Sequence, residues 1–372
     1  MTARIAELGP ERLRRALDGL VPYEPGRPVE EVQRELGLER VVKLASNEGQ
    51  LGPFPAAREA IARSMLEGNR YPDGGAFLLR AALAERHDVS LDEVTVCAGA
   101  DAVIGYVCYA LLDPGDEAVM GWPSFTSYLL DTRKAGAVPV LAPLREHHLD
   151  VDALLGAITA RTKLVFVATP NNPTGTMTGR KDLDRFFARV PEHVLTVVDQ
   201  AYLEYVDDPG YPDAIADYAK QGHRVLVLRT FSKLYGLAGL RVGYGVGPAS
   251  VIAAIGKVRR PFDVTAPGQA AALASLPEED EVVSRRHANR ASMSALLDVL
   301  RGHGLEPAGP AVANFAFVDV GEDAARLDGA LLEHGVIVRP VGAFGAPGGL
   351  RITAGTLDEV GVLADALDQV LR

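Results

Sequence analysis

Cysteine, tryptophan and long apolar runs are all scarce in this chain of 372 residues, which has two cysteines and one tryptophan. Two cysteines, Cys97 and Cys108, are too few for a disulfide framework, and both lie in one apolar stretch, which favours a reducing compartment. The longest apolar window, 94–112, is interrupted by Thr95, Asp101 and two glycines, so it predicts a strand, a turn and a buried helix rather than a membrane span. We therefore expect a soluble, cytoplasmic protein.

Positively charged residues are fewer than negatively charged ones. The chain has 38 lysine and arginine residues and 49 aspartate and glutamate residues, which gives a net charge of −11. This balance opposes nucleic acid or an anionic membrane as a partner. The N-terminal segment has no apolar run of the kind that a signal peptide requires. With 48% hydrophobic residues, the chain can build a full core, and its length allows about two domains.

Short apolar runs predict buried strands, and segments with helical periodicity lie between them. The predicted strands are 95–97, 117–120, 138–141, 164–168, 195–198 and 225–229, and two of the predicted helices are 76–87 and 181–189. This alternation predicts an α/β fold with a mostly parallel central sheet that is covered on both faces.

From about residue 263 the pattern changes to α+β. It predicts a long alanine-rich helical region, a strand, a helix, a strand and a final helix, with the first four over 269–300, 314–320, 324–334 and 336–339. We therefore expect an N-terminal arm that joins the small domain, a large domain and a smaller C-terminal domain, over 1–45, 46–262 and 263–372.

Four polar clusters follow predicted strands at their carboxyl ends, where open α/β sheets bind ligands. They are Gly99-Ala100-Asp101, Pro170–Gly175, Asp199–Tyr202 and Thr230–Arg241. The first should open a helix, whose unpaired N–H groups suit a phosphate. Their common position predicts a single site.

Lys233 is the most informative residue of these clusters. Hydroxyls of Thr230 and Ser232 flank it, and Arg241 adds a planar fork suited to phosphate oxygens. The glycines nearby let the backbone approach a ligand closely. Because lysine forms Schiff bases with carbonyl compounds such as pyridoxal phosphate, this segment favours a phosphate-bearing aldehyde as the ligand.

Other polar residues fit such a ligand but have ordinary alternatives. Asp199 follows an apolar run, where it either pairs with a pyridinium nitrogen or caps a helix. Asn172 and Tyr202 could hydrogen-bond a phenolic oxygen, although Asn-Pro is also a common turn former. Phe125 could stack on a flat ring or belong to the core.

Alternative kinds of site receive less support. The glycines of 243–247 do not have the spacing of the dinucleotide fingerprint, and no Walker-type phosphate loop is present. His147-His148 lies in a charged loop without other ligand types nearby, so no metal is expected.

Taken together, these segments resemble the fold-type I pyridoxal-phosphate aminotransferases, and within them the histidinol-phosphate aminotransferase family and its aromatic aminotransferase relatives. The resemblance covers nearly the whole chain. Its further motifs are Tyr23-Glu24-Pro25-Gly26, Lys43–Glu48, Arg70–Asp73, Ala313-Asn314-Phe315 and Leu350–Thr353.

The resemblance implies pyridoxal 5′-phosphate as the cofactor. It implies that Lys233 forms the Schiff base and moves the substrate proton, and that Asp199 pairs with the pyridine nitrogen. Asn172 and Tyr202 are the implied partners of the phenolic oxygen, and Phe125 takes the stacking place. The implied phosphate ligands are Ala100, Asp101, Thr230, Ser232 and Arg241.

The resemblance also implies a homodimer with shared sites, because Tyr71 matches a tyrosine that reaches the phosphate bound by the partner subunit. Arg351 matches the arginine that binds the substrate carboxylate. Tyr23, Asn47 and Arg339 match positions that line the substrate pocket.

The sequence departs from the family pattern at three places without losing a catalytic group. Gly49-Gln50 replaces the usual Asn-Pro, Ala102 replaces an acidic residue, and Gln200 replaces glutamate. The implied reaction transfers the amino group of L-histidinol phosphate to 2-oxoglutarate in histidine biosynthesis. An aromatic amino-acid aminotransferase and a decarboxylase of the same fold remain alternatives.

Overall fold

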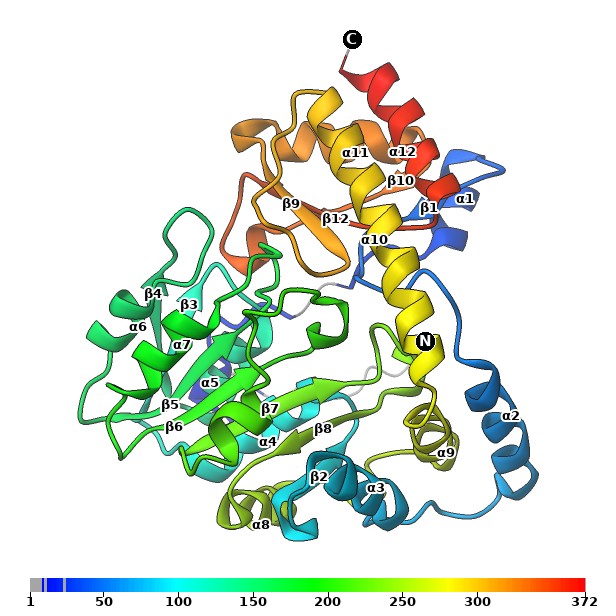
Figure 1. Ribbon diagram of the computed structural model, residues 1–372. Helices are drawn as coiled ribbons and strands as arrows, with labels where there is room; N and C mark the ends of the chain where they lie inside the picture. Colours follow the sequence, from blue (N-terminus) through cyan, green and yellow to red (C-terminus); the bar gives the residue numbers. More distant parts are fainter. Residues whose placement is uncertain (1–8, 10–11, 23–24, 372) are drawn as a thin grey trace.

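The computed structural model describes residues 9, 12–22 and 25–371. Its main sheet has seven strands in the order β2-β8-β7-β6-β5-β3-β4 (Figure 1). In chain order these strands are β2 (Val94–Cys97), β3 (Glu117–Trp122), β4 (Val138–Pro143), β5 (Thr162–Ala168), β6 (Leu195–Asp199), β7 (Val225–Thr230) and β8 (Gly243–Val246). The pairs from β4 to β7 are parallel, and only β8 runs antiparallel to its neighbours.

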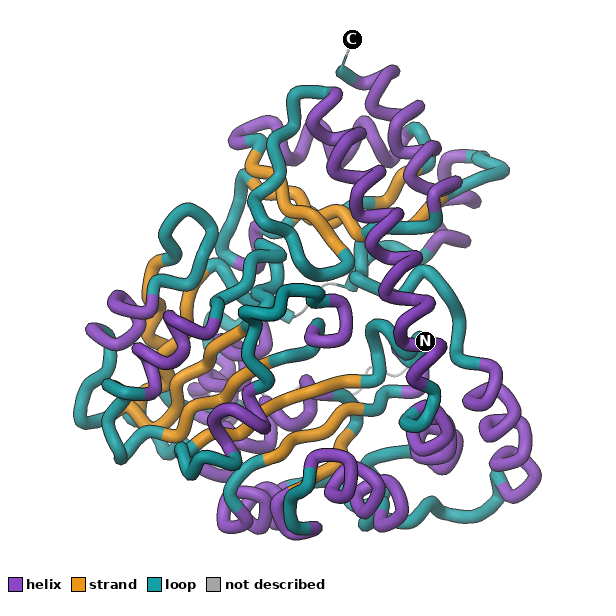
Figure 2. Tube along the Cα trace, in the orientation of Figure 1, coloured by secondary structure: helices purple, strands orange, loops and turns teal. Residues whose placement is uncertain are grey.

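Alternate residues of the parallel strands face two separate parts of the core, because successive side chains of a strand point to opposite faces. In β5, Leu164 and Phe166 belong to one buried cluster, while Val165 and Val167 belong to the other. The first cluster includes residues of α4 (Ala100–Leu111), α5 (Thr126–Ala135) and α8 (Ala249–Val258); the second includes residues of α3 (Phe77–His87), α6 (Val151–Gly156) and α7 (Arg180–Phe187). The sheet is therefore covered on both faces, as predicted, and Figure 2 shows helices on either side of it.

The six predicted strands of this sheet are confirmed, but β8 was not predicted. Its sequence, Gly243-Tyr244-Gly245-Val246, is rich in a residue that weakens strands. The structure supplies the reason, because a Cβ atom on Gly243 would lie 2.1 Å from the backbone nitrogen of Ala100. Glycine lets β8 pass directly beneath the start of α4.

A second body contains the C-terminal part of the chain. A three-stranded antiparallel sheet, in the order β11-β12-β9, is formed by β9 (Phe315–Asp319), β11 (Arg339–Pro340) and β12 (Gly349–Thr353). A separate parallel pair joins β1 (Val42–Lys43) to β10 (Val336–Ile337). A buried cluster ties these strands to α10 (Glu279–Gly302), α11 (Ala324–Glu333) and α12 (Leu357–Val370).

Two predictions for this region are wrong in detail. The predicted helix over 269–300 is two helices, α9 (Ala266–Ser275) and α10, with Pro277 in the break between them. The predicted strand over 336–339 is two short strands, β10 and β11, which pair with different partners.

The predicted domain boundaries remain a proposal. The pairing of β1 with β10, together with the packing of Val32 from α1 (Val29–Leu36) near Ile337, supports an N-terminal arm that joins the small domain. In contrast, α9 packs against α2 (Pro55–Ser64) and α3 of the large domain, which favours moving the boundary to the break before α10. Within the described part of the chain, no helix combines the length and the apolarity needed to cross a bilayer.

Candidate active site

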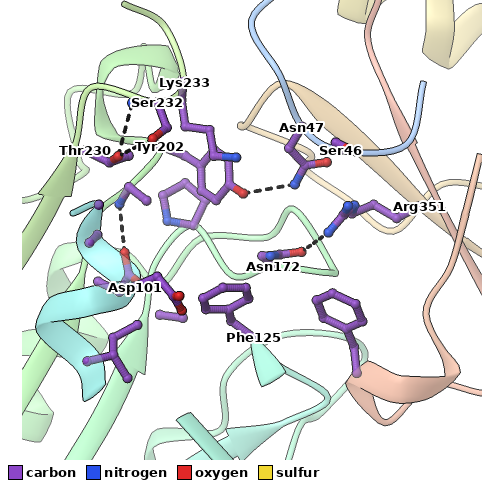
Figure 3. A pocket seen from close by; sticks show the side chains of 18 of the residues that line it. Ser46, Asn47, Asp101, Phe125, Asn172, Tyr202, Thr230, Ser232, Lys233 and Arg351 are labelled. Atoms are coloured by element: carbon purple, nitrogen blue, oxygen red, sulfur yellow. Dashed lines mark hydrogen bonds between the residues drawn. The ribbon is translucent and has the colours of Figure 1, made fainter. Parts of the chain in front are cut away.

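A cavity of about 220 Å³ lies at the carboxyl ends of the parallel strands, where the two bodies meet (Figure 3). Side chains or backbone atoms from all four predicted clusters line it: Gly99, Ala100, Asp101, Pro170, Asn172, Asp199, Ala201, Tyr202, Thr230, Ser232, Lys233 and Arg241. The second body contributes Arg339, Phe344 and Arg351. The structure thus brings together residues up to 325 positions apart in the sequence (26 to 351).

Lys233 extends into this cavity from the loop after β7, with its Nζ 5.5 Å from the centre of the Tyr202 ring (Figure 3). Burial, and secondly the Arg351 guanidinium, lowers the pKa of Lys233 to about 8. Glu48 and Asp199 oppose this shift. An amine with such a pKa is partly neutral near neutral pH, as a nucleophile requires.

Asp199 is the last residue of β6, and both of its carboxylate oxygens accept hydrogen bonds. The Tyr128 hydroxyl donates to Oδ2 over 2.7 Å, and the Ala201 backbone nitrogen donates to Oδ1 over 3.0 Å. Burial raises the pKa of Asp199, and the bond from Tyr128 is the largest opposing effect. Asp199 does not cap a helix here, since the next helical segment is the short 3-10 turn η5 (Leu203–Tyr205).

Tyr128 is a pocket residue that the sequence reasoning missed. The available signal was its position three residues after Phe125, which places the two side chains one turn apart at the start of α5. Their rings meet edge to face, with centres 5.7 Å apart.

The start of α4, Arg241 and two hydroxyls form a cradle for an anion. Gly99 has φ of +91° directly before α4, so the first N–H groups of the helix point towards the cavity end of the sheet. A Cβ on Gly99 would lie 2.7 Å from Nη2 of Arg241, so any other residue here would displace the guanidinium and strain a backbone with φ of +91°. Thr230 donates to the Ser232 hydroxyl over 3.0 Å at the same end of the pocket. These donors match a phosphate group.

The carboxylate of Asp101 does not contribute a donor to this cradle, because it accepts a hydrogen bond from the Ser127 hydroxyl. The backbone of Asp101, at the start of α4, is what the cradle can use.

Asn47, Tyr202, Asn172 and Arg351 form two hydrogen-bonded pairs on the opposite side of the pocket (Figure 3). Asn47 Nδ2 donates to the Tyr202 hydroxyl over 2.9 Å, and Arg351 Nη1 donates to Asn172 Oδ1 over 2.5 Å. Asn47 has φ of +53°, and its backbone nitrogen donates to Thr353 Oγ1, so β12 holds this residue in a strained conformation.

Two arginines place positive charge on the side of the pocket formed by the small body. Arg339 of β11 pairs in register with Arg351 of β12. The Arg351 guanidinium also donates to the carbonyl of Ala45 over 2.6 Å and lies 5.4 Å from the centre of the Phe344 ring. An acidic chain therefore carries a local pair of cations where a substrate would enter.

Of the predicted site residues that the structure describes, Tyr71 alone does not line this cavity. Tyr71 is 82% exposed and stacks on Phe262, with ring centres 4.6 Å apart. Tyr23 lies outside the described residues.

The structure shows the surroundings of the residues that depart from the family pattern. A Cβ on Gly49 would lie 2.7 Å from the Lys233 carbonyl oxygen, so this glycine allows the loop to approach the lysine closely. Gln50 accepts a hydrogen bond from Ser292 of α10 over 2.9 Å. Ala102 is partly buried in the first turn of α4.

Gln200 is fully buried, and its amide uses both its donors and its acceptor. Its Nε2 donates to the Tyr211 hydroxyl and to the Pro212 carbonyl, while its Oε1 accepts from Arg229 and from the Ala214 nitrogen. A glutamate could not make the first two bonds while ionised. The amide is therefore matched to this environment.

Comparison with known proteins identifies the family. The model of aminotransferase classes I and II matches residues 39–367. The chain belongs to this family.

The aminotransferase is similar over almost its whole length to named enzymes. It is 41% identical to histidinol-phosphate aminotransferase of Moorella thermoacetica, over 97% of this chain and 93% of that protein. It is 44% identical to the enzyme of that name in Akkermansia muciniphila, over 95% and 96%. The predicted resemblance is confirmed.

Solved structures of aminotransferases share the fold. Histidinol-phosphate aminotransferase from Sinorhizobium meliloti, in complex with pyridoxal-5′-phosphate, has a TM-score of 0.87 at 27% identity, covering 97% of this chain and 98% of that one. A mutant aspartate aminotransferase of Thermus thermophilus has a TM-score of 0.84 at 28% identity, covering 96% and 98%. The predicted fold class, fold-type I with a mostly parallel sheet, is confirmed.

Proposed function

We propose that this aminotransferase transfers the amino group of L-histidinol phosphate to 2-oxoglutarate and yields imidazole acetol phosphate and L-glutamate. The observation that carries the proposal is the position of Arg339 and Arg351 beside the Lys233 amine in one pocket. Histidinol phosphate carries a phosphate and no carboxylate, whereas 2-oxoglutarate carries two carboxylates. Planar guanidinium forks bind both kinds of anion, so one pair of arginines can serve both substrates in turn.

The cofactor is pyridoxal 5′-phosphate, and the residues of the pocket fit it. When bound, it supplies an aldehyde that condenses with amines and a pyridinium ring that accepts electron density. The cradle of Gly99, Thr230, Ser232 and Arg241 offers donors for a phosphate. The Asp199 carboxylate lies in the same cavity, where it can accept a hydrogen bond from the ring nitrogen.

Four side chains would then carry out the transfer. Lys233 Nζ, partly neutral because burial lowers its pKa to about 8, would accept the proton from the amine-bearing carbon of the donor in the first half-reaction. In the second half-reaction it would donate a proton to the carbon that becomes the amine-bearing carbon of L-glutamate. Asp199, which lines the same cavity, would place its carboxylate against the ring nitrogen of the cofactor. Tyr202, oriented by Asn47, would hydrogen-bond the phenolic oxygen of the cofactor, and Arg351 would hold the anionic end of each substrate.

We also propose a homodimer with shared sites. The segment 65–78 exposes an unusual number of large apolar side chains, with Leu66 at 84%, Leu78 at 67% and Tyr71 at 82% exposure. Exposed apolar side chains that recur within one segment support its burial against another copy of the chain. In that arrangement Tyr71 would reach the phosphate bound by the other subunit. A cytoplasmic location stays a prediction, supported by two buried free cysteines, Cys97 and Cys108.

A panel of amino donors tests the substrate. Purified enzyme with bound cofactor is supplied with 2-oxoglutarate and with histidinol phosphate, phenylalanine or tyrosine, and glutamate is measured. We expect the highest kcat/KM with histidinol phosphate. Good turnover of phenylalanine without turnover of histidinol phosphate would identify an aromatic aminotransferase instead. Consumption of donor without glutamate formation would indicate a decarboxylase.

A further inference from the structure

We propose that Tyr128 is a positioning residue, which fixes the Asp199 carboxylate and the Phe125 ring in the cavity that would receive the cofactor. The inference deepens the proposed function and rests on it. It assigns a role to a buried tyrosine that does not itself have to touch a reacting atom.

Tyr128 has one contact for each part of this role. It lies in the first turn of α5 and is 1% exposed. Its hydroxyl donates to Asp199 Oδ2 over 2.7 Å, and its ring meets Phe125 edge to face with 84° between the planes. On its other side it stacks on Phe166 of β5, with centres 4.7 Å apart and 15° between the planes. The sheet therefore holds the tyrosine, and the tyrosine holds the two pocket residues.

The raised pKa of Tyr128 makes its hydroxyl the donor in the hydrogen bond to Asp199. Burial, and secondly the negative charge of Asp199, holds the pKa of Tyr128 well above its usual value. The hydroxyl therefore keeps its proton and acts as the donor. The other groups that act on Asp199 are the Ala201 nitrogen and the Lys233 amine, which favour its ionised form, and Asp101, which disfavours it.

Loss of the hydroxyl would leave Asp199 Oδ2 without this donor in a buried setting. A hydrogen bond to a charged group stabilises the folded state more than a bond between neutral groups does. Without the Tyr128 hydroxyl, only the bond from the Ala201 nitrogen to Oδ1 would orient the Asp199 carboxylate. The carboxylate would turn or bind a proton more readily. In either case it would accept the hydrogen bond of the ring nitrogen less well.

A matched pair of variants separates this role from simple packing. Tyr128→Phe removes the hydroxyl and keeps the ring contacts with Phe125 and Phe166. Tyr218→Phe makes the same change at another buried tyrosine, which donates to Asp184 Oδ1 over 2.8 Å and does not line the cavity. Both variants lose one tyrosine-to-carboxylate hydrogen bond.

The experiment measures the wild type and both variants in three ways. Titration of the apoprotein with pyridoxal phosphate gives the Kd, steady-state kinetics give kcat and KM separately, and visible absorption of the holoenzyme is followed against pH. Urea unfolding of the apoproteins reports stability. Should Tyr128→Phe fail to fold, Tyr128→3-fluorotyrosine keeps the shape and makes the hydroxyl a stronger donor.

For Tyr128→Phe we expect a Kd for the cofactor about tenfold higher and a kcat about tenfold lower, with little change in KM for 2-oxoglutarate. The pH midpoint of the visible absorption should move upward, because a ring proton that is held less firmly withdraws less electron density. With Tyr128→3-fluorotyrosine the midpoint should move downward. Tyr218→Phe should leave Kd, kcat and the midpoint unchanged.

Two results would overturn the inference: unchanged Kd, kcat and absorption midpoint in Tyr128→Phe, or equal changes in Tyr218→Phe. A 3-fluorotyrosine variant with the wild-type midpoint would do the same. Failure of the proposed function looks different, because then the wild type itself would not bind pyridoxal phosphate or would not form glutamate.

Discussion

The lowered pKa of Lys233 makes a quantitative prediction about the stability of the apoprotein. Burial beside Arg351 lowers the pKa from its ordinary value of 10.5 to about 8. Such a shift corresponds to roughly 3 kcal/mol of destabilisation when the amine must be charged in the folded state. Because the cavity is open to solvent on one side, we expect about 2 kcal/mol to be realised. Methionine is uncharged and similar in length to lysine, so Lys233→Met removes this destabilisation.

The sign follows from proton binding. Below pH 8 both the folded and the unfolded states carry the charged lysine, so the full cost is present in the wild type. Between about pH 8 and 10.5 the folded state has lost the proton and the unfolded state has kept it, so wild-type stability rises with pH. Above that window the cost is absent. The advantage of Lys233→Met should therefore be largest near pH 7 and should disappear towards pH 11.

Urea unfolding of apoproteins at a series of pH values measures this difference, at one protomer concentration because a dimer's stability depends on it. Lys257→Met is the matched control, since Lys257 is exposed on α8 and should show no such pH-dependent gain. A difference between wild type and Lys233→Met that stays constant from pH 7 to 11 would refute the reasoning. So would a gain in stability that grows with pH.

Three further changes have distinct expected effects. Asp199→Asn should lower kcat on the order of 100-fold or more, without lowering the unfolding free energy of the apoprotein by a comparable amount, because it removes a buried charge; kinetics and urea unfolding check this. Gly99→Ala, which forces a Cβ against Arg241 at φ of +91°, should raise the Kd for pyridoxal phosphate at least tenfold by equilibrium dialysis. Gly256→Ala, which meets open space, should not. Arg351→Lys keeps the charge but loses the planar fork, so KM for 2-oxoglutarate should rise about tenfold or more in initial-rate assays.

Each of these predictions has a result that contradicts it. Wild-type turnover by Asp199→Asn would remove the ring-nitrogen role. Equal affinities in the two glycine variants would show that the cradle tolerates a Cβ. An unchanged KM in Arg351→Lys would mean that this arginine does not hold the anionic end of the substrate.

The central strands could be predicted from the sequence because they are buried on both faces. Leu164 and Phe166 face one half of the core and Val165 and Val167 the other, so no polar residue interrupts the run. The same reasoning could not find β8. Its first glycine, Gly243, is explained by the approach of α4, which is a tertiary contact and has no local signature.

The pocket was predictable to the extent that its residues follow strands. Asp199 is marked by its position at the end of β6, and Lys233 by its position shortly after β7. Arg339 and Arg351 are not marked by any local pattern; the resemblance supplied them, and the pairing of β11 with β12 explains why they lie together. Tyr128 was missed because its partner Asp199 is 71 residues away, and only the packing of α5 on the sheet joins them.

The most direct test of the central claim compares wild type with Lys233→Ala in a single assay. Both proteins are prepared with pyridoxal phosphate, and glutamate formed from histidinol phosphate and 2-oxoglutarate is measured, with the oligomeric state checked by light scattering. We predict that Lys233→Ala remains a folded dimer and forms no glutamate above background, while the wild type turns over. Near-normal glutamate formation by Lys233→Ala would contradict the account.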